Sequence, residues 1–276
     1  MYPAIFGRTY PVTNSSDVFA AAAADGYCGV QFNLLSAGLA SLPEELPEGV
    51  AEQVRDAAQS RKIRLAALSG TYNMAHPDPN ARAASREGFR NVLKAAQRMG
   101  SPIVTLCTGS RDPNDMWKRH PDNQSVAAWS VFRVELDFAL GLAETFGIKL
   151  GVEPEPGNVV NDADAARRLL DEVASPLLGI VLDAANLLSS ETLPEQHGVI
   201  EKAAQLLGDS LLLAHAKDID SFGRVTAAGE GAVDLPWFVT ALRAVGYDGA
   251  LIGHGFPVEK AASVSKTLTG LIGRAA

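Results

Sequence analysis

The chain has 276 residues, of which 47% are hydrophobic and 20% are charged. This composition is ordinary for a soluble globular protein and leaves room for one large core or two small ones. The formal net charge is −8, and Lys and Arg do not cluster. We therefore expect no nucleic-acid partner and no membrane surface, because both recruit basic clusters.

Cysteine usage and hydrophobic run lengths bear on where the protein works. The two cysteines, Cys28 and Cys107, are too few for a disulfide framework, which favours a reducing, cytoplasmic location. The opening stretch MYPAIFGRTYPV lacks a basic n-region, and no later apolar run is long enough to cross a bilayer. We expect neither a signal peptide nor a transmembrane helix.

Short runs rich in Val, Ile and Leu alternate along the chain with longer stretches of helical periodicity. The expected strands cover residues 3–8, 27–32, 63–69, 102–107, 148–153, 179–183, 211–217 and 250–254. The expected helices cover residues 16–25, 50–61, 86–100, 124–146, 162–173, 194–207, 235–245 and 258–272. Several of these helices open on a capping residue such as Asp162 and close on a glycine such as Gly147.

A strand followed by a helix, repeated about eight times, predicts an α/β fold of the closed (β/α)8 TIM-barrel type. An open doubly wound sheet is the main competitor, but the first expected strand is not followed by the G-x-G-x-x-G turn typical of that fold. No linker or low-complexity tract divides the chain. We therefore predict one domain over residues 1–276.

Acids and histidines stand at or near the ends of the last four expected strands. Glu153 ends the fifth strand and Asp183 the sixth, His215 lies late in the seventh, and His254 ends the eighth. In a parallel barrel these side chains would surround one mouth, where two carboxylates and two imidazoles suit a divalent transition metal. A core histidine and a helix-capping aspartate are the structural alternatives, but four such residues at one mouth favour the metal site.

Other residues near this mouth are candidates for substrate binding. The segment 108–123 contains Arg111, Trp117 and His120, a set that can hold a sugar by ring stacking and hydroxyl hydrogen bonds, and Tyr72 lies in segment 70–78. An ordered surface loop is the alternative. Asn186 and Lys217 follow two of the acid and histidine positions, and are expected to contact the metal or the substrate. A turn cap and a solvated salt bridge are their alternatives.

The motifs VEPE, VLDAAN, LAHAKD and YDGALIGH, in this order and spacing, resemble the sugar phosphate isomerase/epimerase family of xylose isomerase-like TIM barrels. The resemblance covers nearly the whole chain. It implies one divalent ion, Mn²⁺ first and Mg²⁺, Co²⁺ or Zn²⁺ as alternatives, bound by Glu153, Asp183 and His215. The family's fourth ligand is a glutamate, whereas this chain has His254, and the histidine that often follows the aspartate by three residues is Asn186 here.

Glu153 and Glu155 are each followed by a proline, which stiffens the segment that carries them. We assign Glu153 to the metal and Glu155 to the substrate; the alternative is that Glu155 caps a turn or pairs with Arg111. The expected reaction is isomerisation or epimerisation of a sugar or keto-sugar derivative through an enediolate. Glu153 or Glu155 would remove the proton, and His254 or Lys217 would return or relay it.

Two other functions remain open from the sequence, and a third is disfavoured. A metal-dependent lyase or dehydratase acting on a keto-sugar or hydroxy acid would use the same residues. A sugar-binding barrel without catalysis is also compatible with the missing eighth-strand glutamate. A related group of barrels cleaves DNA with several metal ions, which five histidines and a negative net charge argue against. A homodimer is compatible with the apolar residues of the outer helices.

Overall fold

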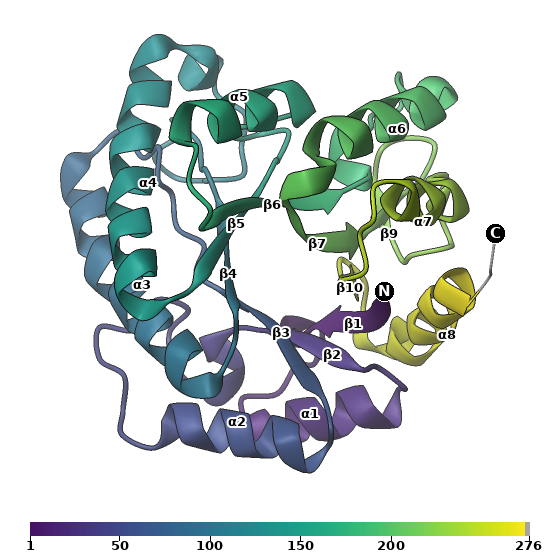
Figure 1. The fold of residues 1–276 in the computed structure, drawn as a ribbon, viewed down its shortest axis with the longest axis horizontal. Coiled ribbons are helices and arrows are strands. Elements are labelled where there is room, and N and C mark those ends of the chain that lie inside the picture. Colours follow the sequence, from purple (N-terminus) through teal and green to yellow (C-terminus); the bar gives the residue numbers. More distant parts are fainter. Residues whose placement is uncertain (274–276) are drawn as a thin grey trace.

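Eight parallel strands close into a barrel with helices around it in the computed structural model, which describes residues 1–273 (Figure 1). The strands are β1 (Tyr2–Phe6), β2 (Gly29–Phe32), β3 (Arg64–Ser69), β4 (Ile103–Cys107), β5 (Lys149–Glu153), β6 (Leu178–Asp183), β7 (Leu211–Ala216) and β10 (Ala250–Gly253). Because β1 pairs with both β2 and β10, the sheet has no free edge. The predicted TIM barrel is confirmed.

The helices follow the strands in order around the barrel, so that colour changes steadily around the ring in Figure 1. They are α1 (Ser15–Ala24), α2 (Val50–Ser60), α3 (Pro79–Met99), α4 (Val126–Phe146), α5 (Ala163–Val173), α6 (Gln196–Leu207), α7 (Leu235–Ala244) and α8 (Ala261–Gly273). A short antiparallel hairpin that the sequence did not predict, β8 (Asp218–Ile219) with β9 (Val225–Thr226), follows β7. None of the described helices is long and apolar enough to cross a membrane.

Helix α3 begins at Pro79, well before residue 86, where the apolar periodicity predicted its start. The Asp78 side chain accepts a hydrogen bond from the backbone N–H of Asn80, and Pro79 stands in the first turn, where its missing N–H does no harm. The first turns of α3 carry few apolar residues, so periodicity missed them. The cap and the proline were the signal for the true start.

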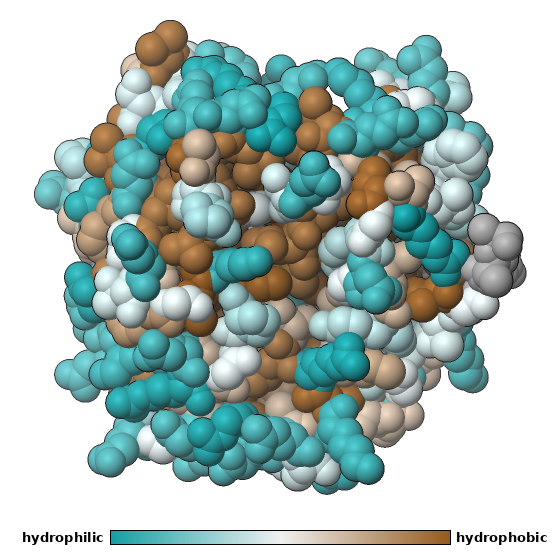
Figure 2. Space-filling view, in the orientation of Figure 1, coloured by the Kyte–Doolittle hydropathy of each residue, from teal (hydrophilic) through white to brown (hydrophobic). Residues whose placement is uncertain are grey.

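Two apolar layers hold the barrel together. Its interior contains small and branched side chains, including Ala4, Ala67 and Val181, and the helices pack on its outer surface around larger side chains. Phe19 of α1 stacks on Phe32 of β2 with ring centroids 5.6 Å apart. In Figure 2 apolar residues gather in the middle of the face, and hydrophilic residues surround them over the helices.

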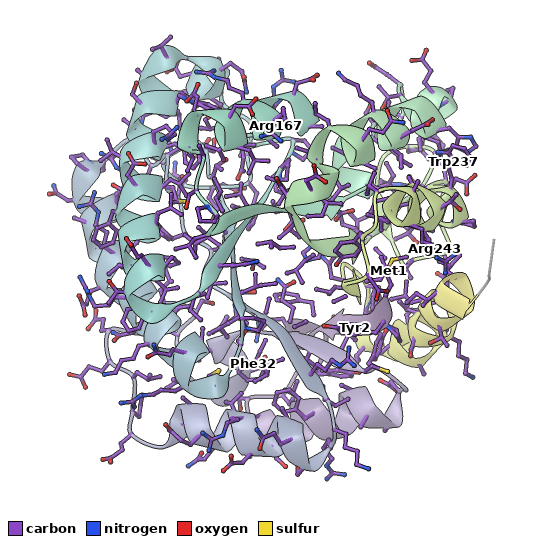
Figure 3. The ribbon with its side chains drawn as sticks, viewed as in Figure 1. Met1, Tyr2, Phe32, Arg167, Trp237 and Arg243 are labelled. Carbon is purple, nitrogen blue, oxygen red and sulfur yellow. The ribbon has the colours of Figure 1, made fainter. Side chains whose placement is uncertain are left out.

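The ends of the described chain meet where the barrel closes. The amino group of Met1 pairs with Asp248, which lies between α7 and β10. Arg243 of α7 donates a hydrogen bond to the carbonyl of Ile272 in α8. Figure 3 labels Met1 and Arg243, which lie on the same side of the molecule as α8. The first contact joins the start of the chain to the loop before β10, and the second joins α7 to α8.

Candidate active site

A cavity of about 460 Å³ opens at the carboxyl ends of the barrel strands. Its lining residues come from all parts of the chain: Phe6, Gln31, Asn33, Ser41, Ser69, Thr71, Thr105, Cys107, Met116, Trp117, Glu153, Glu155, His215, Lys217, Val225, His254 and Gly255. Active sites of TIM barrels occupy this face.

Three of the four residues predicted as metal ligands, Glu153, His215 and His254, line this cavity, and the fourth, Asp183, is buried beside them. One side-chain donor atom from each of Glu153, Asp183, His215 and His254 lies within 4.8 Å of the other three. Nδ1 of His215 is 3.1 Å from Oε1 of Glu153, and Nε2 of His254 is 3.1 Å from Oδ2 of Asp183. Strand register explains the meeting, because Asp183 on β6 lies directly opposite His215 on β7.

Asn186 and Lys217 border this four-residue cluster. The amide nitrogen of Asn186 donates to Oε1 of Glu153 at 3.0 Å, and Lys217 donates to the Asn186 amide oxygen. The Lys217 ammonium also lies 3.4 Å from Oδ2 of Asp183. Both residues therefore contact the carboxylates from outside the cluster, as a positioning amide and a nearby positive charge.

The two carboxylates of the cluster are held ionised. Burial acts to raise the pKa of Asp183, but the nearby Lys217 and His254 lower it well below its usual range. Burial likewise opposes ionisation of Glu153, and the adjacent His215 imidazole outweighs it, so that the pKa of Glu153 is lowered. Ionised carboxylates are the form that binds a metal ion.

Glu155 has the opposite protonation behaviour. Burial, followed by the negative charge of Glu153, raises the pKa of Glu155 to about 8. The side chain therefore carries a proton at neutral pH, beside ionised neighbours. Burial lowers the pKa of Lys217, but Asp183 and Glu155 outweigh it and raise that pKa, so Lys217 stays cationic. Neighbouring carboxyl groups with separated pKa values are typical of acid/base sites.

The donor set fits a divalent metal ion. Two carboxylates and two imidazoles are ligands that zinc, manganese and cobalt accept, and the four donors are close enough to share one ion. Cys107 lies near Glu153 and Glu155 in a second group of donors. Burial raises the pKa of the Cys107 thiol, so it stays protonated and is a poor ligand.

Trp117 lies at the cavity rim, and the residue is 50% exposed. The segment that carries it is nonetheless firmly held. The buried Asn158 amide donates to the carbonyl of Met116 at 2.9 Å, and the buried Ser110 hydroxyl donates to the carbonyl of Lys118 at 2.5 Å. A Cβ at Gly157 would lie 1.9 Å from the Trp117 carbonyl oxygen, so only glycine permits this close approach.

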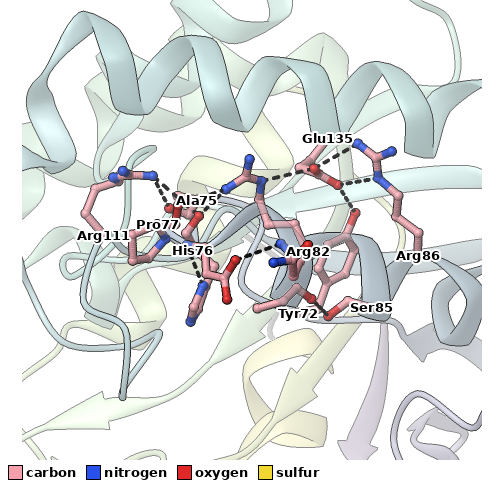
Figure 4. A network of polar contacts seen from close by, with 12 residues as sticks. Tyr72, Ala75, His76, Pro77, Arg82, Ser85, Arg86, Arg111 and Glu135 are labelled. Carbon is pink, nitrogen blue, oxygen red and sulfur yellow. Dashed lines mark hydrogen bonds and ion pairs between the residues drawn. The ribbon is translucent and has the colours of Figure 1, made fainter.

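Of the five predicted substrate-binding residues, Trp117 lines the cavity, and Asn186 lies behind it against Glu153. The other three lie outside the cavity lining. The Tyr72 hydroxyl lies 3.5 Å from Glu135 of α4, and the Arg111 guanidinium donates to the carbonyl of Ala75 at 2.9 Å (Figure 4). The His120 ring accepts a hydrogen bond from the backbone N–H of Asp122. These contacts order the loops around the mouth, and Arg111 is turned to backbone carbonyls, not toward Glu155.

Neutral polar residues of the cavity escaped the sequence analysis. Ser69 is the last residue of β3, Gln31 is the next to last of β2, and Thr105 lies in the middle of β4; all three are buried. Acids and histidines stand out in an apolar strand, whereas hydroxyl and amide groups do not. A signal did exist for Gln31, which interrupts the otherwise apolar YCGVQF run.

Comparison with known proteins was made for sequence and for structure. The profile of a family described as xylose isomerase-like TIM barrel matches residues 19–268. A comparison with curated proteins finds no significant match.

Solved structures share the fold at low sequence identity. The 3-keto-D-glucoside 4-epimerase from E. coli has a TM-score of 0.76 at 17% identity, covering 99% of both chains. The IOLI protein, solved with a zinc atom, has a TM-score of 0.73 at 17% identity, covering 99% of this chain and 98% of the other. Mannonate dehydratase from Streptococcus suis has a TM-score of 0.72 at 16% identity, with coverages of 98% and 93%.

Proposed function

Since this chain belongs to the xylose isomerase-like TIM barrel family, we propose that it is a divalent-metal-dependent isomerase or epimerase of a sugar or keto-sugar derivative. One observation carries the proposal. Two ionised carboxylates and two imidazoles lie within 4.8 Å of one another at the strand ends, beside a carboxyl group that keeps its proton at neutral pH.

The metal would be held by Glu153, Asp183, His215 and His254. A bound divalent ion supplies Lewis-acid stabilisation of the negative charge that develops when a proton leaves the carbon next to a carbonyl. Mn²⁺ is our first candidate, and the solved relative with a zinc atom supports testing Zn²⁺ beside it. Asn186 donates to Glu153 and so fixes the orientation of that carboxylate.

Glu155 is our candidate for proton transfer to and from the substrate. It lines the cavity and, with a pKa of about 8, it can exchange a proton near neutral pH. Lys217 lies on the same side and keeps a positive charge close to the acids. The second proton-transfer group is His254 or Lys217, because both line the cavity.

The remaining lining residues suit a polyhydroxylated substrate. Hydroxyl and amide groups of Asn33, Ser69 and Thr71 provide donors and acceptors for sugar hydroxyls. The indole of Trp117 presents an aromatic face at the rim, where the C–H face of a sugar ring can stack.

A dehydratase is the second candidate, and the protonated Glu155 favours it. A buried carboxylic acid can protonate a departing hydroxyl group after the same proton removal. Analysis of the products separates the two reactions, since elimination gives an unsaturated or keto product with the loss of water, whereas epimerisation conserves mass.

The decisive test is the metal content of wild type and His254→Ala, measured by mass spectrometry, with turnover on a panel of keto-sugars. Wild type should carry about one divalent ion for each chain and convert at least one sugar. Loss of the ion in His254→Ala would support His254 as a ligand, and retention would assign it to proton transfer. Wild type that binds no supplied metal would refute the proposal, and metal without turnover would favour a sugar-binding protein.

A further inference from the structure

Gln31 contacts the His215 ring from another part of the barrel. It lies on β2, is 4% exposed, and its Oε1 is 2.8 Å from Nε2 of His215 on β7. Strands β1 and β10 lie between β2 and β7 in the sheet. The contact therefore crosses the barrel interior and does not follow from strand pairing.

Two hydroxyl groups orient the Gln31 amide. Its nitrogen lies 3.2 Å from Oγ of Ser69 and 3.3 Å from Oγ1 of Thr105, and both of these residues are buried. An amide nitrogen only donates, so it gives one hydrogen to each hydroxyl oxygen. The amide oxygen, which only accepts, is left facing His215.

This orientation decides which imidazole nitrogen carries the hydrogen. Nε2 of His215 must donate to the Gln31 oxygen, and a neutral imidazole then has its lone pair on Nδ1. Nδ1 faces the other side, 3.1 Å from Oε1 of Glu153 and within the four-residue cluster. The Nδ1 lone pair and the Glu153 carboxylate oxygen are both acceptors, so at 3.1 Å from each other they can both bind one cation.

The backbone places Gln31 for this contact. Val30 of β2 lies opposite Leu65 of β3, whereas Gln31 lies opposite Ala67, so the register shifts between Val30 and Gln31. Irregularities of this kind re-aim side chains and occur next to active sites.

We propose that Gln31 is a positioning residue that fixes the ring of His215 with Nε2 as the donor, so that Nδ1 is presented to the divalent metal ion. The inference rests on the metal site of the proposed function. Outer partners of metal-binding histidines usually change metal affinity by about 10- to 100-fold when they are removed.

Titration calorimetry with Mn²⁺ on wild type, Gln31→Met and Gln31→Glu tests the proposal. Gln31→Met keeps the side-chain length but loses the acceptor, and should bind Mn²⁺ about 10- to 100-fold more weakly. Gln31→Glu keeps an acceptor oxygen and should retain most of the affinity. The same substitution at an exposed glutamine of α2, Gln53→Met, is the control and should leave the affinity unchanged.

Nitrogen NMR of histidine-labelled, Zn²⁺-loaded wild type gives a readout that does not depend on any variant folding. His215 should carry its hydrogen on Nε2 and bind zinc through Nδ1. Zinc on Nε2, or equal Mn²⁺ affinities of wild type and Gln31→Met, would overturn this inference alone. Failure of wild type to bind either ion would overturn the proposed function and this inference with it.

Discussion

Buried acids at two places in this barrel, Glu135 between helices and the pair Glu153 and Asp183 at the mouth, have different neighbours. Glu135 of α4, 2% exposed, accepts hydrogen bonds from the guanidinium groups of Arg82 and Arg86 at 2.9–3.2 Å, as Figure 4 shows. At the mouth, Glu153 and Asp183 are both ionised.

At the mouth, the Lys217 ammonium lies 3.4 Å from Asp183, and the imidazoles of His215 and His254 contact Glu153 and Asp183. Permanently charged arginines therefore balance the acid that joins helices, whereas the acids at the mouth face one lysine and two imidazoles that can exchange a proton for a metal ion. If this contrast holds, substitutions at the mouth should affect metal binding and substitution of Glu135 should affect stability.

Substitution of a mouth residue should have the largest effect. Glu153→Gln and His215→Ala each remove a donor from the cluster, so both should abolish metal binding and turnover. Metal content by mass spectrometry and turnover with excess Mn²⁺ measure the outcome. Full activity in either variant would remove the assignment of that residue as a ligand.

Glu135→Gln should affect stability and leave the metal site alone. The substitution leaves two arginines facing an uncharged amide, and we expect a loss of about 2 kcal/mol in the free energy of unfolding. The loss is no larger because Arg86 is partly exposed and water can solvate its charge. Denaturant titration measures it, and Mn²⁺ affinity should stay at the wild-type value. Glu87→Gln, which breaks an exposed pair with Arg90, is the matched control with an expected loss under about 0.5 kcal/mol. A large fall in Mn²⁺ affinity for Glu135→Gln would contradict the assignment of Glu135 to stability alone.

Glu155→Gln should change how stability depends on pH. In the unfolded chain this carboxyl loses its proton near its ordinary pKa, whereas in the folded protein it keeps the proton up to about pH 8. The folded state therefore binds more protons between these values, so wild-type stability falls as pH rises through this window. Relative to wild type, metal-free Glu155→Gln should gain at least about 1 kcal/mol between pH 5 and pH 8.5. Thermal unfolding in the presence of a chelator measures the difference. Parallel stability profiles of wild type and Glu155→Gln against pH would show that the folded protein does not raise the pKa of Glu155.

Trp117→Ala should have the smallest effect and should act on binding alone. Loss of the aromatic face should raise KM by about 5- to 10-fold, which corresponds to a stacking contribution of about 1 kcal/mol, with kcat changed little. Steady-state kinetics on a substrate found with the keto-sugar panel measure this. Trp237→Ala, on α7 and away from the cavity, is the control. An equal fall in kcat and kcat/KM would place Trp117 in the chemical step.

Much of the fold could be predicted because its signals are local. The alternation of apolar runs and amphipathic segments gave the βα order, and capping residues such as Asp162 marked helix starts. The start of α3 was missed where Pro79 and Asp78 give a cap but the next residues lack apolar periodicity. The residues of the cluster could be anticipated from their places at strand ends, because parallel strands bring their carboxyl ends to one mouth.

The tertiary structure alone decided which polar side chains face that mouth. Segments 70–78 and 108–123 have no periodic pattern, so the sequence could not tell that Tyr72 and Arg111 turn to Glu135 and to backbone carbonyls while Trp117 remains at the rim. The contact between Gln31 and His215 joins residues far apart in the chain and depends on barrel closure and on a register shift. Periodicity and motif spacing record which face of an element is buried, but contacts across the barrel depend on how the whole sheet closes.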